Sequence, residues 1–207
     1  MSSQHLRGDP GTDVTIKFLR DGVGEDREPQ TITVKRSIVR IPDVKYFGFV
    51  GDPQDRIGYI DLYGFANDAG REVRFAIRAL QHGAEMIARE EENGPQGEDG
   101  ERFNLADADP TKLKGLILDL RSNPGGLLTS AVDVSTLFVP NGSDIVSAKG
   151  RGFPESLYRS KTDPTLSSNT NLAVLVNDQT ASAAEIVSGA VQDLDVGGKD
   201  FFHHSHL

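Results

Sequence analysis

The sequence predicts a mixed α/β (α+β) fold in which buried strands alternate with amphipathic helices. Twice, at 114–137 and again at 171–193, a short continuous apolar run is followed by a loop of small residues and then by an apolar stripe at helical spacing. Upstream, residues 12–41 alternate apolar and polar side chains, which is typical of a β-hairpin. The chain is therefore expected to join an N-terminal pair of strands to a core of strand–loop–helix units.

The hairpin is the first predicted element. Val14, Ile16 and Phe18 share one face of the stretch TDVTIKFLRDG, and Ile32 and Val34 repeat the alternation in QTITVKRSIVRI. The turn-rich stretch DGVGEDREP lies between them. A lone hairpin is marginally stable in water, so these strands are expected to belong to a larger sheet.

A strand over residues 57–65 and a long helix follow. The apolar residues of this helix recur at intervals of three and four: Val73, Ile77, Leu80, Ala84 and Ile87. The next stretch, REEENGPQGEDGER, is rich in charge, Gly and Pro, and is expected to be a solvated loop.

Two strand–loop–helix units complete the core. KGLILDL (114–120) and NLAVLV (171–176) are typical of strands buried on both faces of a parallel sheet. RSNPGG ends the first strand and leads to a helical stripe: Leu127, Leu128, Ala131, Val134 and Leu137. NDQTA ends the second strand and leads to the helix SAAEIVSGAVQD. Because ligands bind beyond the C-terminal ends of such strands, NPGG and TASAAE are expected to line one crevice.

The bulk composition narrows the range of functions. Of 207 residues, 37% are hydrophobic and 26% charged, which is ordinary for a globular protein. Acidic residues outnumber basic ones by 31 to 22, and no basic cluster offers a nucleic-acid footprint. The chain has no cysteine, which excludes disulfides and thiol catalysis, and no cofactor or metal is expected. No apolar run reaches the ~18 residues of a membrane span, and the start of the sequence has no apolar signal region.

Ser182 has two interpretations. With Glu185 it forms the pattern Ser-x-x-Glu, a capping box that begins a helix and requires no chemistry. A hydroxyl at a helix N-terminus also lies among unpaired N–H groups, which can stabilise an alkoxide or the oxyanion of a tetrahedral intermediate. Ala181, Ala183 and Ala184 leave room beside it for a substrate backbone. The residues alone leave both interpretations open.

The NPGG stretch bears on the same choice. It suits a plain turn before a helix, but its glycines would also let a peptide approach closely and supply a second backbone N–H. Two such loops, each after a buried strand and each leading into a helix, favour a shared catalytic crevice over two unrelated turns.

These paired motifs resemble the C-terminal processing peptidases, also called tail-specific proteases. KGLILDLRSNPGGLLTSAVDVSTLFVP and NLAVLVNDQTASAAEIVSGAVQD are similar to that family's two hallmark segments, with Ala184 where the family carries a second serine. LRGDPGTDVTIKFLRDG and TITVKRSIVRIPDV are similar to the closing strands of the PDZ domain that precedes the family's catalytic core.

The resemblance implies a domain plan. Residues 1–38 would be a partial PDZ domain and residues 39–193 a ClpP/crotonase-like core of β-β-α units, with a charged insertion near 84–112. Residues 194–207 would form an atypical tail. Relatives act in the periplasm or thylakoid lumen and cut the C-terminal tails of polypeptides, which the PDZ domain captures as an added strand.

The resemblance also implies the roles of the site residues. Ser182 would be the nucleophile, and the amides of Ala183 and Gly126, with Gly125 adjoining, would form the oxyanion hole. Glu185 would cap the helix and organise the site.

The sequence departs from the family pattern at the position of the general base. A serine hydroxyl needs a base, and the family uses a lysine about two dozen residues further on, where this chain has Leu207. Lys199 is the one lysine after Ser182 and lies in a different local sequence. The tail histidines are expected to be inert, although imidazole is a common base and metal ligand: His203, His204 and His206. His5 and His82 are expected to face solvent.

Three functions therefore remain. The first is a serine-type endopeptidase of the C-terminal processing family that is incomplete for want of its lysine. The second is a catalytically inactive relative that binds peptides only. The third, acyl-thioester chemistry on a crotonase-type core, is disfavoured by the peptidase motif around Ser182 and by the lack of an adenine-nucleotide signature.

Overall fold

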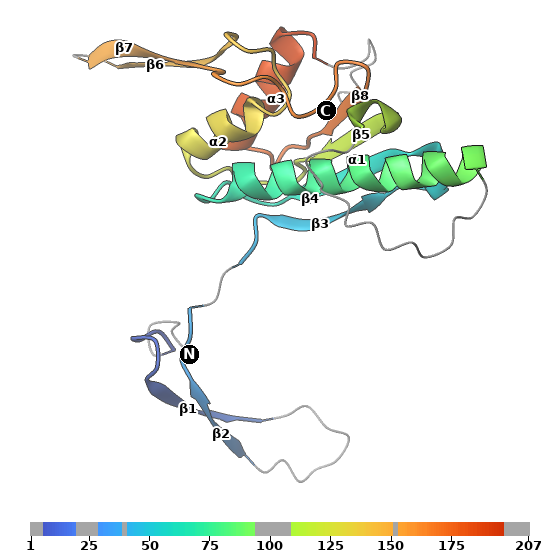
Figure 1. Cartoon of the computed structure of the whole chain (residues 1–207). Helices are drawn as coiled ribbons and strands as arrows, with labels where there is room; N and C mark the ends of the chain where they lie inside the picture. The colour runs from blue at the N-terminus through green and yellow to red at the C-terminus, as the bar shows by residue number, and fades with distance from the viewer. Residues whose placement is uncertain (1–5, 20–28, 39–40, 94–108, 151–152, 197–207) are drawn as a thin grey trace. The chain divides into compact units, whose positions relative to one another are not determined.

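The structure is a computed structural model that describes residues 6–19, 29–38, 41–93, 109–150 and 153–196. It divides into two compact units, Met1–Ile41 and Pro42–Leu207 (Figure 1). Each unit is described by itself in the following paragraphs.

The N-terminal unit contains the predicted hairpin. β1 (Asp13–Phe18) pairs antiparallel with β2 (Gln30–Lys35), so that Val14 lies opposite Val34 and Ile16 opposite Ile32. Arg36 closes the base of the hairpin, since its N–H donates to the Thr12 carbonyl at 2.7 Å. The hairpin prediction is confirmed. The described residues of this unit form a two-stranded sheet, and the larger sheet that we expected stays a prediction.

A four-stranded sheet forms the base of the C-terminal unit. Its strand order is β3–β4–β5–β8, with bounds Val44–Phe49, Ile57–Leu62, Gly115–Asp119 and Asn171–Leu175. β4, β5 and β8 are parallel, whereas β3 is antiparallel to β4. The three predicted core strands are confirmed with shorter bounds. β3 is an addition that sequence patterning did not predict.

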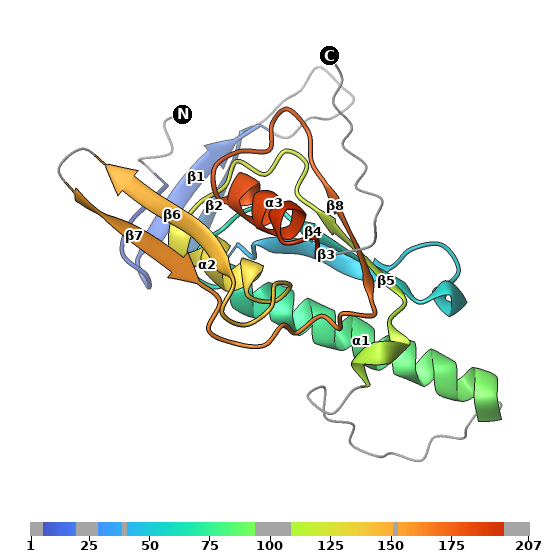
Figure 2. The same cartoon turned by 90° about the horizontal axis from the view of Figure 1, so that it is seen from above.

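Three helices pack against one face of this sheet: α1 (Ala69–Asn93), α2 (Leu128–Ser135) and α3 (Ala183–Asp193) (Figure 2). The side chains of β4, β5 and β8 on this face are buried in one cluster with the helices: Ile60, Leu62, Leu116, Leu118, Leu172 and Val174. Tyr59, Ile117 and Leu175 point to the opposite face and are only half-buried. The expectation that these strands are buried on both faces is therefore wrong for the described residues.

Two further predictions need correction, and one element was missed. α1 continues to Asn93, because its helical pattern extends into the charged stretch that we expected to be a loop. α2 is shorter than its predicted stripe: Leu127 is 44% exposed and precedes the helix, and the buried Leu137 follows it. The hairpin of β6 (Asp144–Gly150) and β7 (Phe153–Arg159) was not predicted. Residues 94–108 lie outside the described residues.

Candidate active site

Three loops meet at one edge of the sheet, where β4, β5 and β8 end. They are residues 63–66, 121–127 and 177–182. The C-terminal ends of parallel strands share an edge, so loops far apart in the sequence come together there. Sequence analysis expected the second and third loops to lie together here and missed the first.

Asn123 links the second and third loops to the end of β4. Its side chain is fully buried, and its Nδ2 donates to the Leu62 carbonyl at 2.6 Å, at the end of β4. Its Oδ1 accepts the N–H of Gly125 at 2.8 Å, and its own carbonyl accepts the N–H of Ala181 at 3.0 Å. A buried amide whose donor and acceptor are both satisfied fixes the groups it joins. Sequence analysis quoted this asparagine in the NPGG motif but assigned it no role.

The two glycines bring the second loop against the third. Gly125 has φ +90°, and a Cβ added there would lie 2.7 Å from the Ala181 carbonyl oxygen and 2.8 Å from the Ser182 Cβ. Gly126 has φ +154°, and a Cβ there would overlap the Phe65 carbonyl. A side chain is excluded at both positions, by the backbone conformation and by the lack of space. The NPGG turn and the Ser182 loop are therefore in van der Waals contact.

The first loop holds the turn from its other side. The N–H of Phe65 donates to the Gly125 carbonyl at 3.2 Å, and the N–H of Leu127 donates to the Phe65 carbonyl at 2.8 Å. In this parallel bridge between Phe65 and Gly126, both hydrogen bonds use the backbone groups of Phe65. The N–H of Gly126 is consequently directed away from Phe65.

Two backbone donors of these loops carry no hydrogen bond within the described residues, namely the N–H groups of Gly126 and Ala183. The N–H of Gly125, in contrast, is bonded to Asn123. Gly125 thus contributes the close approach of the two loops, whereas Gly126 and Ala183 have amides available for an acceptor. An oxyanion hole requires such a pair of preorganised donors.

Ser182 itself is exposed and lies at the N-terminus of α3. The capping box with Glu185 is present, and the N–H of Ser182 donates to Glu185 Oε2 at 2.6 Å. Ser182 nevertheless has φ 55° and ψ −115°, whereas an ordinary N-cap residue adopts the β region. A non-glycine residue in such a conformation costs about 1–3 kcal/mol, and such residues cluster at functional sites. Capping alone therefore does not account for this backbone.

A second set of bonds braces the same two loops. The N–H of Ser122 donates to Asn177 Oδ1 at 2.8 Å, and Thr180 Oγ1 donates to the Leu120 carbonyl at 2.8 Å. Thr180 Oγ1 also accepts the N–H of Asn177 at 2.9 Å. The loop that presents Ser182 is thus tied to the end of β5 at several points, although Asn177 and Thr180 were not among the predicted site residues.

A charged cluster anchors the start of the NPGG loop. Asp119 is 5% exposed and accepts bonds from both Nε and Nη2 of Arg121, and from the hydroxyl of Tyr59 at 2.7 Å. Burial tends to raise the pKa of Asp119, but the hydrogen bonds from Arg121 and Tyr59 outweigh it and hold this pKa below its usual value. Burial and the bond to Asp119 raise the pKa of Tyr59 to about 12. Asp119 is therefore an anion at neutral pH.

The described residues supply no base for Ser182. No hydrogen bond within them joins its hydroxyl to a lysine, histidine or carboxylate. His82 lies half-buried on α1 instead of facing solvent as we expected. Lys199, His5 and the tail histidines lie outside the described residues. Over the same ranges, no cluster of His, Cys, Asp or Glu suits a metal ion, and no helix is long and apolar enough to cross a membrane.

Comparison with known proteins identifies the family. Residues 98–199 match Peptidase family S41. The chain is 34% identical, over 91% of its length, to a carboxy-terminal-processing protease of Bartonella bacilliformis. It is 31% identical, over 93% of its length, to a carboxyl-terminal-processing protease of Synechocystis sp.. The chain is a member of the C-terminal processing peptidases of family S41. It spans 36% and 37% of these two relatives.

Solved structures support the fold. A photosystem II D1 C-terminal processing protease superposes with a TM-score of 0.52 at 24% identity, covering 92% of this chain and 43% of that chain. An S41 protease described as putative, from Bacteroides fragilis, has a TM-score of 0.53 at 18% identity, covering 88% of this chain and 45% of that chain. At these identities the likeness shows the mixed α/β fold alone.

Proposed function

We propose that this chain carries the nucleophile and the oxyanion hole of a serine-type endopeptidase that cuts polypeptides near their C-termini. The observation that carries the proposal is the contact between the Gly125 turn and the strained Ser182. Gly126 belongs to that turn and Ala183 follows Ser182, and the N–H groups of both have no hydrogen bond within the described residues. The names of the two curated relatives support polypeptides as the substrate class.

In this mechanism Ser182 Oγ forms a bond to the scissile carbonyl carbon while its proton passes to a base. The N–H groups of Gly126 and Ala183 donate to the resulting oxyanion. Collapse of the tetrahedral intermediate breaks the C–N bond, and the amine leaves with a proton from the conjugate acid. Water then attacks the acyl-enzyme by the same route and releases the carboxylic acid. Glu185 accepts a hydrogen bond from the N–H of Ser182 and so holds the Ser182 backbone in place.

The second candidate is a peptide-binding domain without catalytic activity. The observation that favours it is that the described residues offer no proton acceptor to Ser182. The crevice and its amides would then bind a peptide carbonyl without cleaving the peptide. The N-terminal hairpin keeps its proposed role in either case, as the closing strands of a PDZ domain that captures substrate C-termini.

A fluorophosphonate probe distinguishes the two candidates, because it labels only an activated serine. We expect labelling of the purified chain, and its loss in Ser182→Ala. Ser188→Ala is the matched control, since Ser188 lies on the same helix and its hydroxyl donates to the Glu185 carbonyl at 3.2 Å. Labelling should persist in this control. Circular dichroism establishes that each variant is folded.

Two results would reject the peptidase proposal. Labelling that survives Ser182→Ala would show that a residue other than Ser182 is the nucleophile. Folded protein that is not labelled would leave the peptide-binding candidate.

A further inference from the structure

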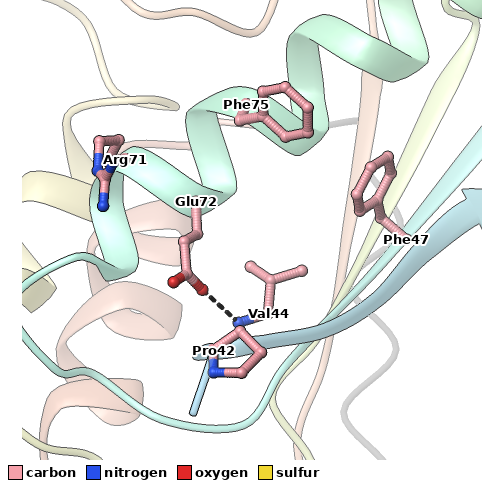
Figure 3. Close-up of a pocket in the computed structure, with 6 residues that line it drawn as sticks. All are labelled: Pro42, Val44, Phe47, Arg71, Glu72 and Phe75. Carbon is pink, nitrogen blue, oxygen red and sulfur yellow. Dashed lines mark hydrogen bonds between the residues drawn. The ribbon is translucent and has the colours of Figure 1, made fainter. Parts of the chain in front are cut away.

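A pocket of about 450 Å³ lies outside the proposed crevice, between β3 and the first turns of α1 (Figure 3). Six residues line it: Pro42, Val44, Phe47, Arg71, Glu72 and Phe75. The rings of Phe47 and Phe75 meet edge to face, with their centroids 6.0 Å apart. Phe75 is 53% exposed, so a large aromatic surface faces solvent beside an open cavity. Pockets of this size and lining are typical of ligand sites.

The two charged residues of the pocket already have partners. Glu72 Oε2 accepts hydrogen bonds from the N–H groups of Asp43 and Val44, at 2.8 Å and 3.0 Å, where β3 begins (Figure 3). Arg71 pairs with Asp68 at 2.9 Å on the protein surface. The remaining lining is apolar. The occupant that best fits this pocket is therefore an uncharged, apolar side chain.

Within the described residues β3 is an edge strand of the sheet, since it pairs there with β4 alone. An edge strand presents a row of backbone N–H and C=O groups to which an extended peptide can add as a further strand. Phe47 points to the helix-covered face of β3, where Phe75 of α1 meets it. A peptide strand added beside β3 would direct every second side chain to that same face, toward the pocket.

The pocket wall is connected to the proposed crevice. Asp43, between the lining residues Pro42 and Val44, accepts the N–H of Tyr63 on its carbonyl at 2.8 Å. Asp43 Oδ1 also accepts the N–H of Ala66 at 3.0 Å. The same loop holds the Gly125–Gly126 turn through Phe65.

We propose that this pocket is a substrate subsite that takes a bulky apolar side chain of an extended polypeptide lying along β3. The inference rests on the proposed function for the identity of the occupant, since polypeptides are the substrates of processing proteases. A second copy of the chain is a poorer occupant, because two copies with a formal charge of −9 each repel one another. An acidic peptide is disfavoured for the same reason.

Fluorescence anisotropy with two short fluorescein-labelled peptides tests the proposal. One peptide is rich in Thr and Ser with a central Phe, and in the other this Phe is Ser. The full chain with Ser182→Ala prevents cleavage, so binding is measured without turnover. We expect the Phe peptide to bind about tenfold more tightly or better, which corresponds to burying one aromatic side chain.

Variants of Phe75 test whether the preference for the Phe peptide comes from the pocket. Phe75→Ser should abolish the preference for Phe, and Phe75→Leu should largely retain it. Tyr46→Ser is the matched control, because Tyr46 lies on the opposite face of the same strand and is 58% exposed. This control should bind both peptides as the parent does.

Several outcomes overturn the subsite. Equal binding of the two peptides, no binding of either, or an equal effect of Phe75→Ser and Tyr46→Ser would each remove it. A concentration-dependent dimer that Phe75→Ser dissolves, seen by sedimentation, would assign the surface to self-association instead. Fluorophosphonate labelling is independent of these measurements, so loss of the subsite and loss of the peptidase proposal remain distinguishable.

Discussion

The N-terminal hairpin and the C-terminal core both pair strands that carry apolar side chains, with different results. In the hairpin, alternation produces a regular antiparallel register, yet Ile32 and Val34 remain 46% and 38% exposed. In the core, Leu118 and Val174 lie on neighbouring strands and are buried under helices, with exposures of 0% and 5%. Hydrogen-bonded pairing thus builds a strand, whereas a second layer of side chains is needed to remove apolar surface from water.

Glycine substitutions should show the largest difference in stability loss between the two units. Gly11 and Gly125 have nearly the same φ, +87° and +90°, but Gly11 has no atom within 4 Å of an added Cβ. Gly125→Ala adds a clash with the Ser182 loop to the backbone strain, so we expect it to cost about 4 kcal/mol of unfolding free energy. Gly11→Ala should cost about 1 kcal/mol, from strain alone. Urea denaturation of both variants measures the difference, and similar losses would contradict the packing of the two loops.

Truncation of a buried side chain should have the next largest effect. Leu118→Ala leaves a cavity between β5 and the helices, so we expect it to cost about 3 kcal/mol. Ile32→Ala in the hairpin should cost less than about 0.5 kcal/mol, because Ile32 is already half in solvent. Thermal unfolding followed by circular dichroism compares them. A large loss for Ile32→Ala would mean that the hairpin buries this side chain against another part of the protein.

Acid should weaken the core through Asp119. The pKa of Asp119 is lowered in the folded state, so its contribution is fully present above the unfolded value of about 3.9. This stabilising contribution is lost as the pH falls below the unfolded pKa and through the lower pKa of the folded state. Asp119→Asn removes a charged partner of Arg121 and should cost about 2 kcal/mol at neutral pH. Melting curves from about pH 6 to pH 3 should fall less steeply for this variant than for the parent. Parallel curves would place the acid sensitivity elsewhere.

Ser182 should show the smallest change, and in the opposite direction. Ser182→Gly relieves the positive φ and should stabilise the core by about 1 kcal/mol while it removes the nucleophile. The hairpin offers a contrast, since Thr33→Gly at a regular strand position should be destabilising. Calorimetry of both variants checks the signs. A destabilised Ser182→Gly would mean that the Ser182 hydroxyl contributes more as a cap than the backbone strain costs.

Sequence patterning predicted the strands and helices best where one side-chain period continues over a whole element. β5 and β8 were found from apolar runs, and α1 from a stripe at helical spacing. β3 was missed because VKYFGF neither alternates cleanly nor forms a continuous apolar run. The end of α1 was misplaced because charge and helical propensity predict opposite structures for residues 89–93.

The site was predicted in part for a similar reason. The two motifs that lead into helices marked Ser182 and the glycines, since both loops follow buried strands. The loop containing Phe65 carries no local signal, because its role lies in a bridge to Gly126, 61 residues further along the chain. Asn123 was overlooked likewise, since one of its partners is at the end of β4 and another is in the Ser182 loop.

Local periodicity was sufficient to place the parallel strands, the helices behind them and the Ser182–Glu185 cap, because each depends on residues a few positions apart. The folded chain alone decided that, among the residues the structure describes, the N–H of Gly125 has a partner and those of Gly126 and Ala183 have none. It also decided that Ser182 is held at positive φ. A backbone amide is available to a substrate only if every potential partner in the fold lies elsewhere. That condition depends on contacts between distant segments, which no short stretch of sequence contains.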